Sequence, residues 1–242
     1  MTEPFLYQDF VRVHEIVRAA LLEGSDPYVL VTGETGTGKT ALLKKLKAEL
    51  DRTRVKVCYF SQAARLGATG LIRVVSETLR VHGSPCYALT FERLQRALAE
   101  ESQRLLLWFD EAHELPQETL GEARALVESD LDQAPRVQVL LAGMSRLRVD
   151  LKAKPHLWRR VGVREELLGL KRDEISPFVA HHFGPPAAKR FCEKGFDAIF
   201  EHGKGAPGLL LPIVRRVLLT ASGKNGIEVE HVADALSRFD LD

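Results

Sequence analysis

The stretch VLVTGETGTGKTALLKKL, residues 29–46, joins an apolar strand, a glycine-rich loop and an amphipathic helix without interruption. Residues 33–40 fill the pattern GxxxxGK followed by Ser or Thr, in the strand and helix context that this pattern requires. Glycines let such a loop approach a polyphosphate, and the N–H groups of residues 36–39 are expected to point inward. We therefore expect a phosphate-binding loop here; a glycine-rich turn without a ligand is the alternative.

Two side chains of this loop have specific expected roles. The Lys39 ammonium group is expected to neutralise β and γ phosphate oxygens, and the Thr40 hydroxyl to hold Mg²⁺. ATP and Mg²⁺ are therefore the expected cofactors. The residues expected to bind the nucleotide are Gly33, Glu34, Thr35, Gly36, Thr37, Gly38, Lys39, Thr40 and Ala41.

Short apolar runs alternate with longer amphipathic stretches, which indicates an α/β fold with a parallel sheet flanked by helices. After residue 170 the strand-like runs stop, so we expect an α/β domain over 1–170 and a small all-helical lid over 171–242. The expected strands are 28–33, 55–60, 104–110, 137–143 and 163–170. The expected helices are 39–52, 70–81, 90–103, 118–131, 171–183, 187–203, 208–223 and 228–239.

The stretch RLLLWFDEAHEL, residues 104–115, is an apolar strand that ends in two acids. A buried strand presents its first acid at the carboxyl edge of the sheet, where Asp110 is expected to order Mg²⁺ through water. Glu111 is then placed to polarise the water that attacks the γ-phosphate. Two acids at a strand end also serve as helix caps. The strand at 55–60 between the two motifs points to ASCE P-loop ATPases, with sheet order 5-1-4-3-2.

The letters DEAH at 110–113 are also typical of a class of nucleic-acid helicases. Those enzymes place ATP between two tandem RecA-like domains, and the second domain supplies arginines across the cleft. Only 132 residues follow Asp110, and two strands and a helical lid already occupy them. The sequence contains no helicase-type SAT triplet either, so we set the helicase interpretation aside.

The composition of the chain does not indicate a function, but it excludes several classes of protein. The chain has 34 Lys and Arg against 33 Asp and Glu, so any basic surface must be local. Three widely spaced cysteines argue against a disulfide framework and a zinc site. Without an apolar run of signal or membrane length, we expect a cytoplasmic protein with no membrane partner.

The order of these motifs resembles that of AAA+ ATPases, and within them the ExeA-type and transposon-regulator group, which includes Mu B, TniB and TnsC proteins. The resemblance rests on VTGETGTGKTALLKKL, LLLWFDEAHELPQETLGEARAL, VLLAGMSRL, LWRRVGVREELLGLKRDEISPFVAHHF and GKGAPGLLLPIVRRVLLTA. It implies a homo-oligomeric ring or filament with ATP at the subunit interfaces. It also implies an arginine that reaches the neighbour's γ-phosphate, with Arg160 the first choice and Arg159 the second. Surface or lid salt bridges are the alternative role for both.

Two positions depart from the pattern of the group. Where relatives often carry a polar sensor after the fourth strand, this chain has Met144, followed by Ser145. Where relatives commonly carry a nucleotide-sensing arginine in the lid, it has Gly208, and Lys204 or Arg215 are possible substitutes. Slow or partner-dependent hydrolysis is therefore expected.

The resemblance implies an ATP-dependent regulator that oligomerises on duplex DNA and recruits or stimulates a transposase. Arg65 and Arg73 are the candidate DNA contacts, and the stretch KAKPHLWRR serves equally well as a DNA surface or a subunit interface. An ExeA-type secretion or signalling ATPase that acts on a protein without DNA is the alternative. A monomeric nucleotide kinase is a third possibility, against which Glu111 and the helical lid both argue.

Overall fold

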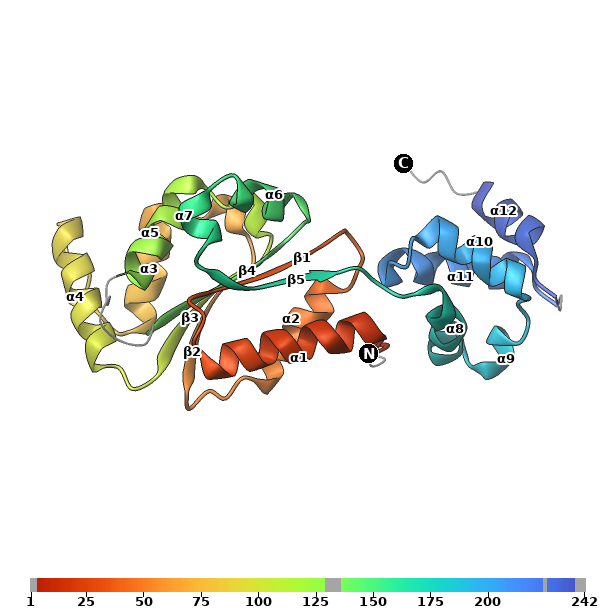
Figure 1. Ribbon diagram of the computed structural model, residues 1–242, viewed down its shortest axis with the longest axis horizontal. Coiled ribbons are helices and arrows are strands. Elements are labelled where there is room, and N and C mark those ends of the chain that lie inside the picture. The colour runs from red at the N-terminus through yellow and green to blue at the C-terminus, as the bar shows by residue number, and fades with distance from the viewer. Residues whose placement is uncertain (1–3, 129–135, 224–225, 238–242) are drawn as a thin grey trace. The chain divides into compact units, whose positions relative to one another are not determined.

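A parallel sheet organises the computed structural model, which describes residues 4–128, 136–223 and 226–237 (Figure 1). Within these residues the sheet has five strands in the order β2-β3-β4-β1-β5. The strands are β1 (Tyr28–Gly33), β2 (Val55–Phe60), β3 (Arg104–Phe109), β4 (Val137–Gly143) and β5 (Val161–Leu167). Read from its other edge, this order is the predicted 5-1-4-3-2, so the expected fold class is confirmed.

Helices connect the strands and make up the chain after β5. In the first part of the chain they are α1 (Gln8–Glu23), α2 (Lys39–Glu49), α3 (Ala68–Thr78), α4 (Tyr87–Glu100), α5 (Gln117–Val127), α6 (Arg146–Lys152) and α7 (Pro155–Trp158). After β5 they are α8 (Ile175–Phe183), α9 (Pro185–Ala188), α10 (Glu193–Gly203), α11 (Pro207–Thr220) and α12 (Val229–Ser237). Short 3₁₀ turns lie at η1 (Ala63–Arg65), η2 (Ala112–Glu114) and η3 (Arg172–Glu174). None of the described helices is both long and apolar enough to cross a membrane.

The central strands are apolar because both of their faces are covered. All residues of β1 and β4 are buried, whereas the edge strands β2 and β5 mix buried and partly exposed positions. Helices α3, α5, α6 and α7 cover one face, and the carboxyl-terminal parts of α1 and α2 lie along the other (Figure 1). The core of the first face includes Leu30, Leu107 and Leu141 from the strands and Leu71 and Leu120 from the helices. Burying such side chains stabilises the fold by roughly 1.5–3 kcal/mol each.

Several elements differ from the sequence prediction. Helices α1, α6 and α7 were not predicted, and the helix expected over 187–203 is divided into α9 and α10. Phe191 lies between them and forms a β-bridge with Ile227, which interrupts the helix. The ends of the helices expected over 118–131 and 228–239 lie outside the described residues.

Two compact units emerge from the pattern of contacts. One contains the described parts of 1–13, 34–42 and 167–242, and the other contains 14–33 and 43–166. The glycine-rich loop thus groups with the start of α1 and with the helices after β5, while the acidic pair belongs with the sheet. A domain boundary at residue 170 stays a prediction.

Candidate functional site

The glycine-rich loop leaves the carboxyl end of β1 and leads directly into α2. Gly36 and Gly38 have φ angles of 82° and 100°, in the left-handed region that side chains disfavour. The Glu34 carbonyl accepts hydrogen bonds from the Thr37 hydroxyl at 2.8 Å and from Lys39 Nζ at 2.9 Å. Because both bonds end on the Glu34 carbonyl, the loop folds back on itself and the Lys39 side chain points into it.

The donors of this loop fit a polyphosphate. Lys39 is only 8% exposed, so its ammonium group lies inside the loop rather than in solvent. Thr40 follows in the first turn of α2, and its exposed hydroxyl is an oxygen ligand of the type that Mg²⁺ accepts. The amino end of α2 adds partial positive charge. The arrangement suits an anion that carries several oxygens.

The acidic pair follows β3, one strand in from the edge strand β2. Asp110 is 8% exposed and accepts hydrogen bonds at both oxygens, from the Tyr59 hydroxyl at 3.1 Å and from the Glu111 N–H at 3.0 Å. Burial and the negative charge of Asp110 raise the pKa of Tyr59, which keeps its hydroxyl protonated as the donor. These two hydrogen bonds therefore fix the orientation of the Asp110 carboxylate.

Glu111 has a strained backbone and an accessible side chain. Its φ of 52° and ψ of 38° are left-handed, which is uncommon for a residue with a side chain. The carboxylate is 48% exposed, whereas the adjacent Asp110 is buried. The turn thus points two neighbouring acids into different environments, one held by hydrogen bonds and one open to water.

His113 lies beneath this turn and connects it to the end of β4. Its side chain is 3% exposed, so the imidazole is shielded from solvent. Nδ1 accepts the Met144 N–H at 3.3 Å and lies 3.4 Å from Glu111 Oε2. A Cβ at Gly143 would come within 3.0 Å of Nδ1, so the glycine makes this close approach possible.

The residues at the two positions that depart from the expected sensor pattern, Met144 and Gly208, both form main-chain hydrogen bonds. Met144 contributes its main-chain N–H to His113, while the Ser145 hydroxyl donates to Glu166 Oε1 at 3.0 Å. In the other unit, the Gly208 N–H donates to the Gly36 carbonyl at 2.9 Å. Gly208 therefore contacts the glycine-rich loop through its main chain.

The two candidate arginines after α7 differ in their contacts. The Arg160 guanidinium forms an ion pair with Glu128, which also accepts a hydrogen bond from Arg124. Arg159 is exposed and makes no ion pair or hydrogen bond with another described residue through its side chain. A carboxylate thus holds the first-choice arginine, and the second-choice arginine is open to solvent.

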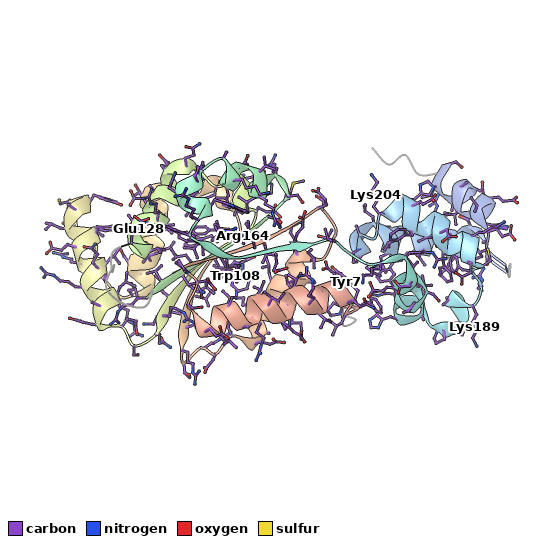
Figure 2. The ribbon with its side chains drawn as sticks, in the orientation of Figure 1. Tyr7, Trp108, Glu128, Arg164, Lys189 and Lys204 are labelled. Carbon is purple, nitrogen blue, oxygen red and sulfur yellow. The ribbon has the colours of Figure 1, made fainter. Side chains whose placement is uncertain are left out.

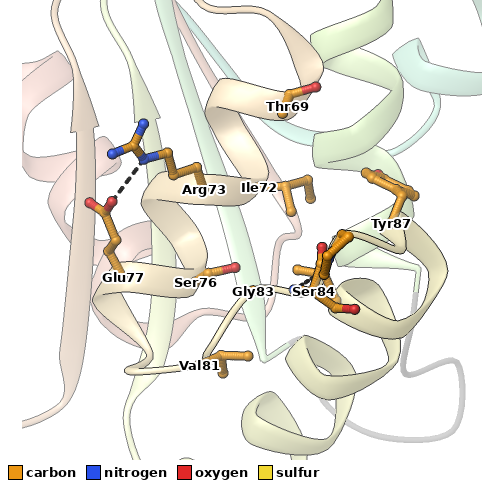
Figure 3. A pocket seen from close by; sticks show the side chains of 11 residues that line it. Thr69, Ile72, Arg73, Ser76, Glu77, Val81, Gly83, Ser84 and Tyr87 are labelled. Atoms are coloured by element: carbon orange, nitrogen blue, oxygen red, sulfur yellow. Dashed lines mark hydrogen bonds and ion pairs between the residues drawn. The ribbon is translucent and has the colours of Figure 1, made fainter.

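The candidate DNA contacts lie on η1 and α3. Arg65 is exposed, and Arg73 pairs with Glu77 at 3.0 Å along the outer face of α3. Arg73 and Glu77 also line a pocket of about 470 Å³ between α3 and the start of α4 (Figure 3). Ser76 and Tyr87 contribute to the same pocket, which shares none of its residues with the loop or the acidic pair.

Sequence patterns did not single out two tyrosines that contact the predicted site residues. Tyr59 binds Asp110, and the Tyr7 hydroxyl donates to the Thr37 carbonyl inside the loop. Both depend on contacts between distant parts of the chain, which local motifs do not encode. The helical spacing of Phe10, Val13 and Val17 is a signal that would have found α1 and drawn attention to Tyr7 at its start.

The strand order, the loop after β1 and the acidic pair after β3 define the fold of a P-loop protein of the AAA+ class. A family model described as AAA domain matches residues 23–149, just over half of the chain. The chain therefore belongs to this family.

Solved structures show the same fold. The chain is similar to Cdc6p from Pyrobaculum aerophilum, with a TM-score of 0.65 and 18% identity over 97% of this chain and 68% of that chain. It is also similar to the ORC2 protein of Aeropyrum pernix, with a TM-score of 0.60 and 17% identity over 98% of this chain and 70% of that one. The chain is similar as well to the RuvB Holliday junction branch migration motor of Thermotoga maritima. The TM-score is 0.56 and the identity 17%, over 97% of this chain and 70% of that chain.

Among curated proteins, the chain is similar to general secretion pathway protein A of Aeromonas hydrophila. The two are 24% identical over 228 residues, which cover 91% of this chain. The chain spans only 42% of the length of that protein.

Proposed function

We propose that the chain binds ATP with Mg²⁺ and hydrolyses it to ADP and phosphate. The observation that carries this proposal is the conformation of the loop, in which two positive-φ glycines precede a buried Lys39. The Lys39 ammonium group is held inside the loop by its hydrogen bond to the Glu34 carbonyl. A positive charge held beside main-chain N–H groups suits the oxygens of a polyphosphate, to which such groups form strong hydrogen bonds.

Each group has a proposed role in the reaction. The N–H groups of residues 36–39 and the Lys39 ammonium group would bind phosphate oxygens, and Thr40 and Asp110 would hold the metal, Asp110 through water. A metal held by these residues would supply positive charge that offsets the negative charge of the phosphoryl group. Glu111 takes a proton from the water that attacks the γ-phosphorus, and ADP departs. Its exposed carboxylate and left-handed turn support this role.

We further propose that copies of the chain assemble into a ring or filament and complete one another's sites. Arg160, or otherwise Arg159, would stabilise charge on the γ-phosphate held by the neighbouring copy. In the single chain, Glu128 holds this guanidinium in an ion pair. Assembly would then exchange a carboxylate partner for a phosphate.

Mixing two inactive variants tests the arginine in trans. Arg160→Ala is expected to lower ATP turnover roughly 10³-fold without weakening ATP binding. Mixing it with Glu111→Gln is expected to restore part of the activity, because some interfaces then combine an intact Glu111 with an intact Arg160. Phosphate release in titrated mixtures measures this recovery.

Glu128→Ala is the matched control for this experiment, because it breaks the same ion pair and leaves Arg160 in place. It is expected to retain activity. If Glu128→Ala loses as much activity as Arg160→Ala and mixing restores none, Arg160 is structural, and the same experiments with Arg159→Ala decide the second choice.

For the assembly we propose a regulatory role on duplex DNA, where it recruits or stimulates a transposase. The exposed arginine Arg65 and the basic residues of the segment 152–159 support a DNA surface, since sequence-tolerant binding rests on phosphate contacts. Structures with the same fold include one of Drosophila ORC described as bound to DNA. That likeness supports the fold, and the DNA role here is our proposal.

ATP-dependent binding to duplex DNA tests this role. At low salt with a non-hydrolysable ATP analogue, the chain is expected to raise the fluorescence anisotropy of a labelled duplex and to form rings or filaments visible by electron microscopy. Arg65→Ala is expected to weaken binding and to reduce the slope of log K against log salt by about one. Arg96→Ala, which removes an exposed arginine paired with Glu92, is the control. Absence of ATP-dependent DNA binding by the unaltered chain rejects the role.

A second candidate is an ATPase that acts on a protein partner without DNA. The likeness to general secretion pathway protein A over 91% of this chain supports this function. Nucleotide-dependent binding to a protein encoded beside this chain, with no response to DNA, would favour it.

A further inference from the structure

Two successive carbonyls of the glycine-rich loop accept hydrogen bonds from distant parts of the same unit. The Gly208 N–H, in the first turn of α11, donates to the Gly36 carbonyl at 2.9 Å. The Tyr7 hydroxyl, just before α1, donates to the Thr37 carbonyl in a short, buried hydrogen bond. The loop is thus hydrogen-bonded both to Tyr7, near the start of the chain, and to Gly208 in α11.

Tyr7 lies next to the amino end of α1 (Figure 2). It is 1% exposed, and its ring packs against Phe10 with centroids 5.6 Å apart. Burial raises its pKa, which keeps the hydroxyl protonated as a donor. A Cβ at Gly38 would come within 3.4 Å of this hydroxyl, so the loop backbone lies directly against it.

The start of α1 also holds the segment that follows β5. The Asp9 carboxylate accepts the Leu168 N–H at 2.7 Å, and Glu174 accepts the Gln8 N–H at 2.7 Å. The residues around Tyr7 therefore connect the loop to the beginning of the lid helices. A shift of the loop backbone would therefore be expected to move both the start of α1 and the segment after β5.

At Gly208 the contact depends on the absence of a side chain. A Cβ there would lie 2.9 Å from Gly36 Cα and 3.2 Å from its carbonyl oxygen. Gly208, where relatives are expected to carry an arginine, is thus in close contact with the loop backbone. A larger residue would have to separate α11 from it.

The carbonyl that Tyr7 binds belongs to the same peptide group as the Gly38 N–H, one of the expected phosphate donors. The two ends of a trans peptide group point in opposite directions. A donor on the carbonyl therefore fixes the direction of the N–H, and hydrogen bonds at both ends polarise the group and strengthen each other. The phosphate and Tyr7 would then act on opposite ends of one peptide group.

We propose that Tyr7 is a positioning residue for nucleotide binding, which orients the Thr37–Gly38 peptide group, and that Gly208 links the lid to the same loop through its main chain. This inference rests on the proposed ATP-binding function. In relatives, a lid arginine is expected to link the nucleotide to the lid. Here the main-chain hydrogen bond between Gly208 and Gly36 would provide that link. Tyr7 acts through the loop and has no part in the chemical step.

Tyr7→Phe tests this role, since it keeps the ring and removes only the donor. The Kd for ATP is expected to rise about tenfold, because the loop carbonyl loses its buried partner. The increase in Tm produced by saturating ATP is expected to shrink, and kcat is expected to change less than KM. Calorimetric titration and thermal unfolding with and without ATP measure these effects.

Tyr28→Phe is the matched control. Tyr28 is also 1% exposed, but its hydroxyl has no hydrogen-bond partner among the described residues. Its replacement is expected to leave the Kd for ATP unchanged. If Tyr7→Phe lowers Tm without nucleotide but leaves the Kd unchanged, Tyr7 is only structural and the inference fails.

A second pair of variants decides the matter if Tyr7→Phe does not fold. Gly208→Ala is expected to raise the Kd for ATP by pushing α11 away from the loop, whereas Gly121→Ala in α5 adds a methyl group that meets nothing within 4 Å. Equal Kd values for both would overturn the inference. Failure of the unaltered chain to bind ATP would instead reject the proposed function itself, together with this inference.

Discussion

Glu111→Gln is expected to leave ATP bound and almost unhydrolysed. Gln keeps the size of the side chain and tolerates the same turn, but it cannot accept a proton from the attacking water. Loss of a general base lowers turnover roughly 10²- to 10⁴-fold. Phosphate release under saturating ATP measures the loss, and sizing in the presence of ATP is expected to show a longer-lived assembly.

Glu114→Gln provides the control for this variant. Glu114 lies in the 3₁₀ turn η2 that Glu111 precedes, is 50% exposed, and has its Oε1 4.0 Å from His113 Nε2. Its turnover is expected to stay within about twofold of the unaltered chain, as is usual for a surface substitution. A Glu111→Gln chain that hydrolyses ATP at the unaltered rate would show that the catalytic assignment is wrong.

Lys39→Ala is expected to weaken ATP binding at least about thirtyfold. Removing one partner of a buried, hydrogen-bonded charge pair costs about 2–5 kcal/mol, and each 1.4 kcal/mol is tenfold in affinity. Ala is a good helix former at the start of α2, so the fold is expected to persist. Equilibrium titration with a fluorescent ATP analogue measures the affinity, and circular dichroism checks the fold.

Lys44→Ala removes the same charge from an exposed position on the same helix. It is expected to bind ATP as the unaltered chain does, because a solvated lysine contributes little at this distance from the loop. Equal affinities for Lys39→Ala and Lys44→Ala would contradict a phosphate-binding role for the loop.

The central sheet was predictable because its strands are continuous apolar runs. The predictions for β1, β3 and β4 agree with the structure to within one residue. Strand β5 begins two residues earlier and ends three residues earlier than expected. It is an edge strand of mixed polarity, and the apolar run of Leu168 and Leu170 extends past Gly169, whose φ of 103° departs from strand geometry.

The candidate site divides into a part that local sequence encodes and a part that it does not. The loop and the acidic pair follow from motifs, because their geometry depends on neighbours in the chain. The partners of Asp110, Thr37 and Arg160 lie 51, 30 and 32 residues away, so they depend on how the fold brings segments together. A motif search therefore names the chemical groups but not what holds them in place.

The edges of the sheet limit how copies of this chain are expected to join. Edge strand β2 carries Lys56, ion-paired with Glu101, and β5 carries Arg164, whose guanidinium lies 4.1 Å from the centre of the Trp158 ring. Charged side chains on edge strands oppose the backbone pairing that would let sheets extend from one molecule to the next. In the assembly proposed above, copies are therefore expected to meet through side-chain surfaces rather than by extending the sheet.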